Sequence, residues 1–258
     1  MKIKTMVGLV LSLFFIFTGQ RLQAISDQEL LVRVDSLASY MNTDFAAEYT
    51  ITQRRPGQGD SITKAGVFRR DASETYVILI MDPLISRGQG YLKQGNTLWF
   101  YDPQSRRFNT TSSSDRFQNT NARNSDFTRS TLAQDYKIIA AEDATLGVLK
   151  CRVLTLEAIT SDVTYPRMKI WISEDGLLRR TEDYSLSGQL MRTSVIPDYH
   201  EIGGRFVPRQ ILFEDALRGA HIGGTFVRER TLITISGPSF RRIADSVFSK
   251  THLELVNR

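Results

Sequence analysis

The segment from Tyr91 to Phe108, with the sequence YLKQGNTLWFYDPQSRRF, constrains the fold more than any other part of the chain. Two apolar arms flank Gln94-Gly95-Asn96, where the glycine can adopt the positive φ that a short hairpin requires. Asp102-Pro103 then ends the second arm with another turn. We therefore predict a β-hairpin that continues through a second tight turn.

The second arm of this hairpin is apolar on both faces. Because side chains alternate along a strand, Leu98 and Phe100 point to one face while Trp99 and Tyr101 point to the other. A sheet of this kind is either buried between two layers or holds an apolar ligand on one face. The sequence leaves both alternatives open.

The rest of the chain also has the pattern of an antiparallel β-protein. Thr75 to Met81 is almost entirely apolar, which predicts a central strand that is covered on both faces. Between Tyr136 and Ile235, short alternating runs are separated by turn residues at close intervals, with no βαβ pattern. Such spacing predicts a meander that curls into a barrel or a sandwich within a single domain.

Helices are predicted at only a few positions. Ser26 and Glu29 match a capping box, and the helix that follows carries an apolar stripe that must dock on the sheet. A short helix is also predicted between Thr128 and Tyr136. The stripe of the first helix consists of Leu30, Leu31, Val34, Leu37, Ala38 and Met41.

Residues 110–131 differ from the strands around them. The segment is rich in Ser, Thr, Asn and Arg and has no strand alternation. A segment of this length is either disordered or a functional lid. Its isolated aromatic residues, Phe117 and Phe127, favour a lid that docks on the protein outside its main core.

The N-terminus has the organisation of a signal peptide. Lys2 and Lys4 precede an apolar run from Met6 to Phe17, and a short polar flank with a small residue follows. The run of 12 residues is shorter than the stretch of about 20 that a membrane-spanning helix needs. We expect residues 1–24 to be cleaved, which leaves residues 25–258 as a soluble protein of a bacterial periplasm. An uncleaved anchor is the alternative.

Charge and motifs argue against several classes of function. The formal charge of +5 falls to +2 after cleavage, because the first 24 residues hold three of the 33 basic residues and none of the 28 acidic ones. This balance is far below the basic footprint of a nucleic-acid-binding protein. The three histidines lie apart, the lone Cys151 has no partner for a disulfide, and no hydrolase or phosphate-binding motif occurs. We predict no enzyme, cofactor, metal or nucleic-acid partner.

Several segments together resemble the LolA-like family of outer-membrane lipoprotein-sorting proteins. The resemblance is carried by Asp82-Pro83, Arg87-Gly88, Tyr91-Leu92, Trp99-Phe100-Tyr101, Arg106-Arg107, Ser125-Asp126-Phe127-Thr128, Trp171 and Asp245-Ser246-Val247-Phe248. It implies a mainly β (α+β) fold in which a curved, incompletely closed antiparallel β-barrel wraps a hydrophobic cavity and helices cover the concave face. The family often carries an acidic residue where this sequence has Thr131, so any role of that carboxylate is not carried over.

This resemblance implies a periplasmic carrier that shields the acyl chains of a lipoprotein or lipid on the way to the outer membrane. An inner-membrane transporter would be the donor, and an outer-membrane partner would be the acceptor. A sensor or adaptor that binds a protein partner, in envelope-stress signalling or in a transport complex, is the alternative. The expected lining is Val77, Leu79, Trp99 and Tyr101, or Leu98 and Phe100 on the other face. Phe117, Phe127 and the apolar stripe of the first helix are expected to close the cavity.

Overall fold

The computed structural model describes residues 25–256. The expected signal peptide, residues 1–24, lies outside this part of the chain. Within residues 25–256, no helix is both long enough and apolar enough to cross a membrane.

Strands make up most of the described chain. They are β1 (Phe45–Arg54), β2 (Ser61–Arg70), β3 (Thr75–Asp82), β4 (Gly90–Gln94), β5 (Thr97–Asp102), β6 (Arg107–Thr111), β7 (Tyr136–Leu146), β8 (Leu149–Ala158), β9 (Arg167–Ser173), β10 (Leu178–Tyr184), β11 (Leu190–Val195), β12 (Tyr199–Ile202), β13 (Arg205–Pro208), β14 (Gln210–Ile222) and β15 (Thr225–Ser239). The α-helices are α1 (Asp27–Leu37), α2 (Leu132–Asp135) and α3 (Lys250–Leu255). Short 3-10 helices cover Asp71–Ser73, Leu84–Ser86, Phe117–Asn119, Asn124–Phe127 and Asp245–Phe248.

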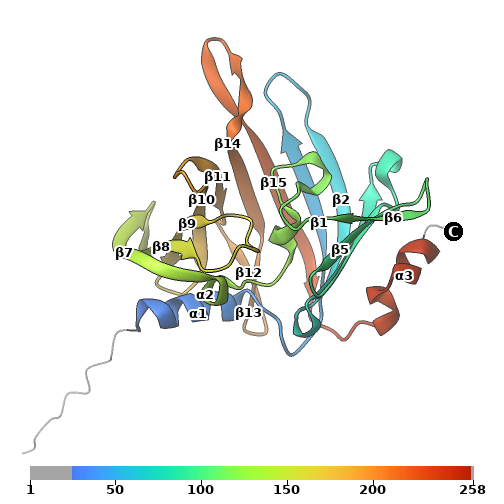
Figure 1. The fold of residues 1–258 in the computed structure, drawn as a ribbon, viewed down its shortest axis with the longest axis horizontal. Helices are drawn as coiled ribbons and strands as arrows, with labels where there is room; N and C mark the ends of the chain where they lie inside the picture. Colours follow the sequence, from blue (N-terminus) through green and yellow to red (C-terminus); the bar gives the residue numbers. More distant parts are fainter. Residues whose placement is uncertain (1–24, 257–258) are drawn as a thin grey trace, which may run out of the picture.

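Thirteen of these strands form one antiparallel sheet, in the order β6-β5-β4-β3-β2-β1-β15-β14-β11-β10-β9-β8-β7. The sheet curls around a concave face, as Figure 1 shows, and its two edge strands, β6 and β7, do not pair with each other. The β12–β13 hairpin forms a separate two-stranded sheet. The fold is therefore mainly β with an antiparallel sheet that does not close, which confirms the predicted fold class.

The hairpin predicted from the sequence is formed by β4 and β5, and it continues into β6 through the second turn. Gly95 in the first turn has a φ of +54°, a conformation that suits glycine because it lacks a Cβ atom. The predicted central strand corresponds to β3, which pairs with β2 on one side and β4 on the other.

Helix α1 packs against the end of the sheet that contains β7, β8 and β9. The predicted capping box of Ser26 and Glu29 is present at its N-terminus. Leu31 and Val34 are buried against apolar side chains of these strands. Met41 is a correction to the predicted stripe, because the helix ends before this residue is reached and Met41 is 50% exposed.

Residues 112–131 connect β6 to β7, and we call this segment the plug. Because its ends are the opposite edges of an open sheet, the plug crosses the concave face (Figure 1). Phe117 and Phe127 are 0% and 2% exposed and belong to the main hydrophobic core, together with Tyr76 and Ile78 of β3. The expectation of a lid outside the core is thus wrong, since these aromatic side chains complete the core.

The C-terminal segment covers the opposite, convex face of the β3–β5 region. Phe248 and Leu253 of this segment pack with Val77 and Leu92 from the strands. A Cβ atom at position 90 would lie 2.5 Å from Leu253 Cδ2, so any larger residue there would displace the Leu253 side chain. The sheet is therefore covered on both faces in this region, which explains why the hairpin is apolar on both sides.

Candidate ligand-binding cavity

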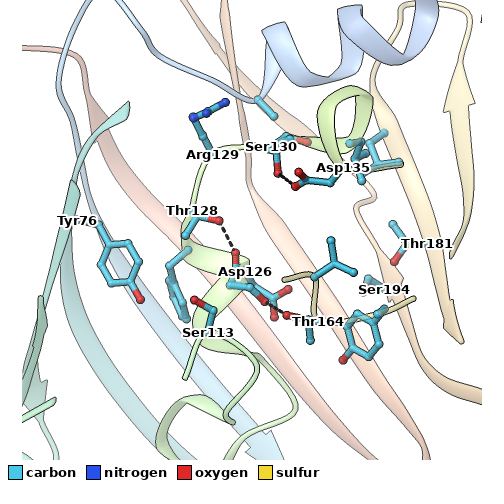
Figure 2. A pocket seen from close by; sticks show the side chains of 18 of the residues that line it. Tyr76, Ser113, Asp126, Thr128, Arg129, Ser130, Asp135, Thr164, Thr181 and Ser194 are labelled. Carbon is cyan, nitrogen blue, oxygen red and sulfur yellow. Dashed lines mark hydrogen bonds between the residues drawn. The ribbon is translucent and has the colours of Figure 1, made fainter. Parts of the chain in front are cut away.

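A cavity of about 1440 Å³ opens on the concave face, between the plug, α1 and strands β9, β10, β11 and β14. Figure 2 shows hydroxyl side chains from the plug and from β10–β11 facing into the same space. The volume exceeds the range of about 300–1,000 Å³ that is typical of sites for small ligands. The cavity can therefore hold a long or branched molecule.

The wall of this cavity has an apolar part, a hydroxyl-rich part and several charged side chains. The apolar part comprises Val34, Leu37, Phe45, Phe127, Met168, Leu178, Ile196, Val207, Ile211, Phe213 and Ile235. The hydroxyl-rich part includes Ser113, Ser125, Thr128, Ser130, Thr164, Thr181 and Ser194 (Figure 2). A wall of this composition suits an amphiphilic ligand better than a purely apolar one.

The strand register separates these two kinds of side chain along the concave face. Ile51 of β1, Ile233 of β15 and Ile211 of β14 are cross-strand neighbours and form an apolar row. Two residues further along each strand, the next row contains a glutamine, a threonine and a phenylalanine and continues into β11 with a serine. These four residues are Gln53, Thr231, Phe213 and Ser194.

The third row across the concave face is charged. Arg192 of β11 lies between Asp183 of β10 and Asp215 of β14 in the register. Arg192 Nε donates to Asp183 Oδ2 at 2.8 Å, while its Nη1 and Nη2 donate to the carboxylate of Asp126 in the plug at 2.6 and 3.0 Å. Arg116 of the plug pairs with Asp215 at 2.5 Å. The concave face therefore changes from apolar to charged along one direction, and the plug is fastened to its charged end.

Burial and pairing shift the pKa values of these carboxyl groups in opposite directions. Burial raises the pKa of Asp183, and the neighbouring Arg192 guanidinium opposes this effect. Burial would also raise the pKa of Asp215. The hydrogen bonds from Arg116 and from the amides of Leu217 and Arg218 outweigh it and lower that pKa. Because breaking a buried ion pair leaves an uncompensated charge, these contacts hold the plug strongly in place.

Four of the residues predicted to line the cavity lie elsewhere. Val77, Leu79, Trp99 and Tyr101 point to the convex face, where the C-terminal segment covers them. Lys250 of α3 lies with its Nζ 4.1 Å from the ring centroid of Trp99. These residues form a second layer of core and not the lining of the concave cavity.

The other predicted residues share the concave face. Leu98 is buried in the main core, and Phe100 packs against that core beside Tyr91, with 5.1 Å between the ring centroids. Phe117 packs between Tyr91 and Phe127 with tilted rings, at centroid distances of 4.9 and 4.6 Å. Of the predicted residues, Phe127 lines the cavity, while Leu98, Phe100 and Phe117 fill the space beside it.

Comparison with known proteins reveals both a family and a fold. A family model described as an uncharacterized protein matches residues 72–255, and the chain belongs to that family. The crystal structure of a LolA superfamily protein from Nitrosomonas europaea is 25% identical, with a TM-score of 0.74, over 89% of this chain and 100% of that chain. The chain has a LolA-like fold.

Two further solved structures share the fold of this LolA-like protein. A DUF1329 family protein from Desulfovibrio piger is 18% identical with a TM-score of 0.76, and covers 88% of this chain and 97% of its own. A Vibrio parahaemolyticus domain named for outer-membrane lipoprotein sorting is 15% identical with a TM-score of 0.76, with the same coverage. No sequence match is found among curated proteins.

The most unusual polar residues of this LolA-like chain lie at positions where the sequence pattern contains little signal. Arg192 lies in the sequence LMRTSV, whose pattern predicts an ordinary strand with the arginine exposed to solvent. In the structure, its side chain is buried between the carboxylates of Asp126 and Asp183. Asp126 and Asp183 are far from it in sequence, so only the fold reveals this cluster. Within residues 25–256, no group of three or more His, Cys, Asp or Glu side chains could hold a metal ion.

Proposed function

We propose that this LolA-like protein is a periplasmic carrier that holds the acyl part of a lipid or lipoprotein in the concave cavity. The observation that carries the proposal is the cavity of about 1440 Å³, which is walled by apolar residues of α1 and of the central strands. The similarity to LolA superfamily proteins, one of them named for outer-membrane lipoprotein sorting, supports the same function.

Burial of methylene groups would supply the affinity. Each buried methylene contributes about 0.8 kcal/mol, so ten of them contribute about 8 kcal/mol. Taken alone, this corresponds to a Kd of about 1 μM, and the cost of ordering the complex offsets part of it. Binding of this strength is reversible, as a carrier that must release its cargo requires.

The location and the direction of transfer are also part of the proposal. Residues 1–24 would direct export and then be removed, so the protein would act between the two membranes of a bacterial envelope. An inner-membrane transporter would deliver the cargo and an outer-membrane partner would receive it. Residues 25–258 would act as one domain, since a single sheet runs through the described part of the chain.

The test is to purify the protein from periplasm without detergent and to analyse both its native mass and an organic extract. A carrier retains a variable set of lipids. Met168→Trp, which places a bulky ring in the cavity, should lower the amount of retained lipid at least tenfold without loss of fold. Leu186→Trp is the matched control, because Leu186 is an exposed residue outside the lining.

The same measurement separates the carrier from an adaptor of the same fold. An adaptor would hold one protein at a fixed stoichiometry, and its organic extract would contain no lipid. That result, or retention of lipid that Met168→Trp does not change, would contradict the proposal.

A further inference from the structure

The hydroxyl-rich wall of the cavity contains a hydrogen-bonding group that the protein leaves unused. Thr181 and Ser194 are cross-strand neighbours on β10 and β11, and both line the cavity (Figure 2). Ser194 is 5% exposed, and its Oγ has no hydrogen-bond partner in the structure. A buried polar atom without a partner is unfavourable, so a ligand group that reaches this hydroxyl would form a hydrogen bond that the protein itself does not supply.

The charged groups nearby do not favour an anion at this position. Arg192 is the basic side chain beside Ser194, and it is already bonded to the carboxylates of Asp126 and Asp183. An anionic head group placed here would lose its hydration and would meet two negative charges for one positive charge. An uncharged group with donors and acceptors avoids this cost.

The other basic residues of the lining form contacts of their own, while Arg129 Nε is buried without a hydrogen-bond partner. Arg69 pairs with Asp71 at 2.7 Å, and Arg129 pairs with Glu74 at 2.6 Å. Lys93 donates its ammonium group to the carbonyl oxygen of Gly95, within the β4–β5 hairpin. Lys93 lacks a carboxylate partner at this contact, which makes it the natural point of attachment for any anionic ligand, away from Ser194.

The register also sets the orientation of a ligand at Ser194. Ser194 on β11 is the cross-strand neighbour of Phe213 on β14. Ile211 lies two residues before Phe213 on β14, a distance of about 7 Å along the strand. Beyond Ile211 the lining continues with Ile235 and Phe45. A head group at Ser194 therefore leaves an apolar path for its hydrocarbon tail towards α1.

We propose that the cavity selects an amphiphile with an uncharged, hydrogen-bonding head group, which Ser194 binds beside Thr181 while the tail lies along Ile211 and Ile235. Hydroxyl, ester and amide groups meet this description, whereas free carboxylates and phosphodiesters do not. The inference rests on the carrier function proposed above, and it adds the chemical class of the cargo.

The experiment measures displacement of a hydrophobic fluorescent dye by three probes with the same acyl chain: a monoacylglycerol, a fatty acid and a lysophosphatidylglycerol. The monoacylglycerol should displace the dye at a concentration at least fivefold lower than either anionic probe. Ser194→Ala should raise the monoacylglycerol concentration needed by about fivefold, as expected for one lost hydrogen bond, and leave the anionic probes unchanged.

Two controls keep this test decisive. Ser187→Ala removes a hydroxyl from the exposed turn between β10 and β11 and should change no displacement curve. The Tm of Ser194→Ala should not fall, because the hydroxyl that is removed has no partner in the protein. Weaker binding combined with an unchanged Tm therefore reports a lost contact to the ligand.

The outcomes distinguish this inference from the carrier function. If the anionic probes bind as tightly as the monoacylglycerol, or if Ser194→Ala changes nothing, the head-group site is wrong while the carrier function stands. Loss of anionic binding in Lys93→Met would then locate the true site at the β4–β5 hairpin. If none of the three probes displaces the dye, the carrier function itself fails and the inference fails with it.

Discussion

Replacing Phe117 with alanine tests whether the plug belongs to the core or is a detachable cover. Phe117 is 0% exposed and its ring contacts those of both Tyr91 and Phe127. Truncation of a buried phenylalanine costs about 3–5 kcal/mol, because apolar contact is lost and a cavity remains. The total free energy of unfolding of a domain is about 5–15 kcal/mol, so this single change should remove a large part of it.

Urea denaturation followed by circular dichroism measures this loss as a lower midpoint at an unchanged slope. In a thermal scan, the same loss lowers the Tm of a domain of this size by about 6–20 °C. Phe226→Ala is the control, because Phe226 is an exposed aromatic residue on the β14–β15 hairpin. A loss for Phe117→Ala below about 1 kcal/mol would show that the plug opens on its own and would refute its place in the core.

Three further outcomes are expected. Asp44→Asn should lower the free energy of unfolding at pH 7 by about 3 kcal/mol in urea titrations. The hydrogen bonds from Arg70 lower the pKa of Asp44, so its contribution is present above about pH 4 and is lost as the pH falls through the folded-state pKa. A deficit that stays constant down to about pH 2 would therefore contradict the role of its charge. Gly90→Ala should displace the Leu253 side chain and lower the free energy of unfolding by about 1–3 kcal/mol. It should also change the tryptophan fluorescence, and an unaltered spectrum together with unaltered stability would refute this prediction. The intact mass of the exported protein should correspond to a chain that starts at Ile25, and retention of the N-terminal residues would disprove cleavage.

Local sequence patterns were sufficient to predict the elements that depend on near neighbours. The capping box at Ser26 and the turn at Gly95 involve residues that are close in the chain, and both form as expected. The period of two in the strands also correctly placed Leu98 and Phe100 on the face opposite to Trp99 and Tyr101.

The concave and convex faces could not be told apart from the same pattern. Alternation shows which side chains share a face, but the curvature of the sheet and the position of distant segments decide what covers each face. The hairpin at Trp99 is covered by Lys250 of α3, about 150 residues later in the chain. The buried position of Arg192 depends in the same way on Asp126, which a loop from the other edge of the sheet brings to it.

The attachment of the plug to both edges of the sheet limits how the molecule can open. Its 20 residues join the last residue of β6 to the helix that precedes β7, so neither end is free. A segment attached at both ends cannot rotate away about one end. It can only move outward in its middle part, as an arch. Fully extended, it could reach about 70 Å, so its length does not restrict the arch. The two sheet edges therefore stay joined by covalent chain, and any outward movement of the plug must first break the core contacts of Phe117 and Phe127.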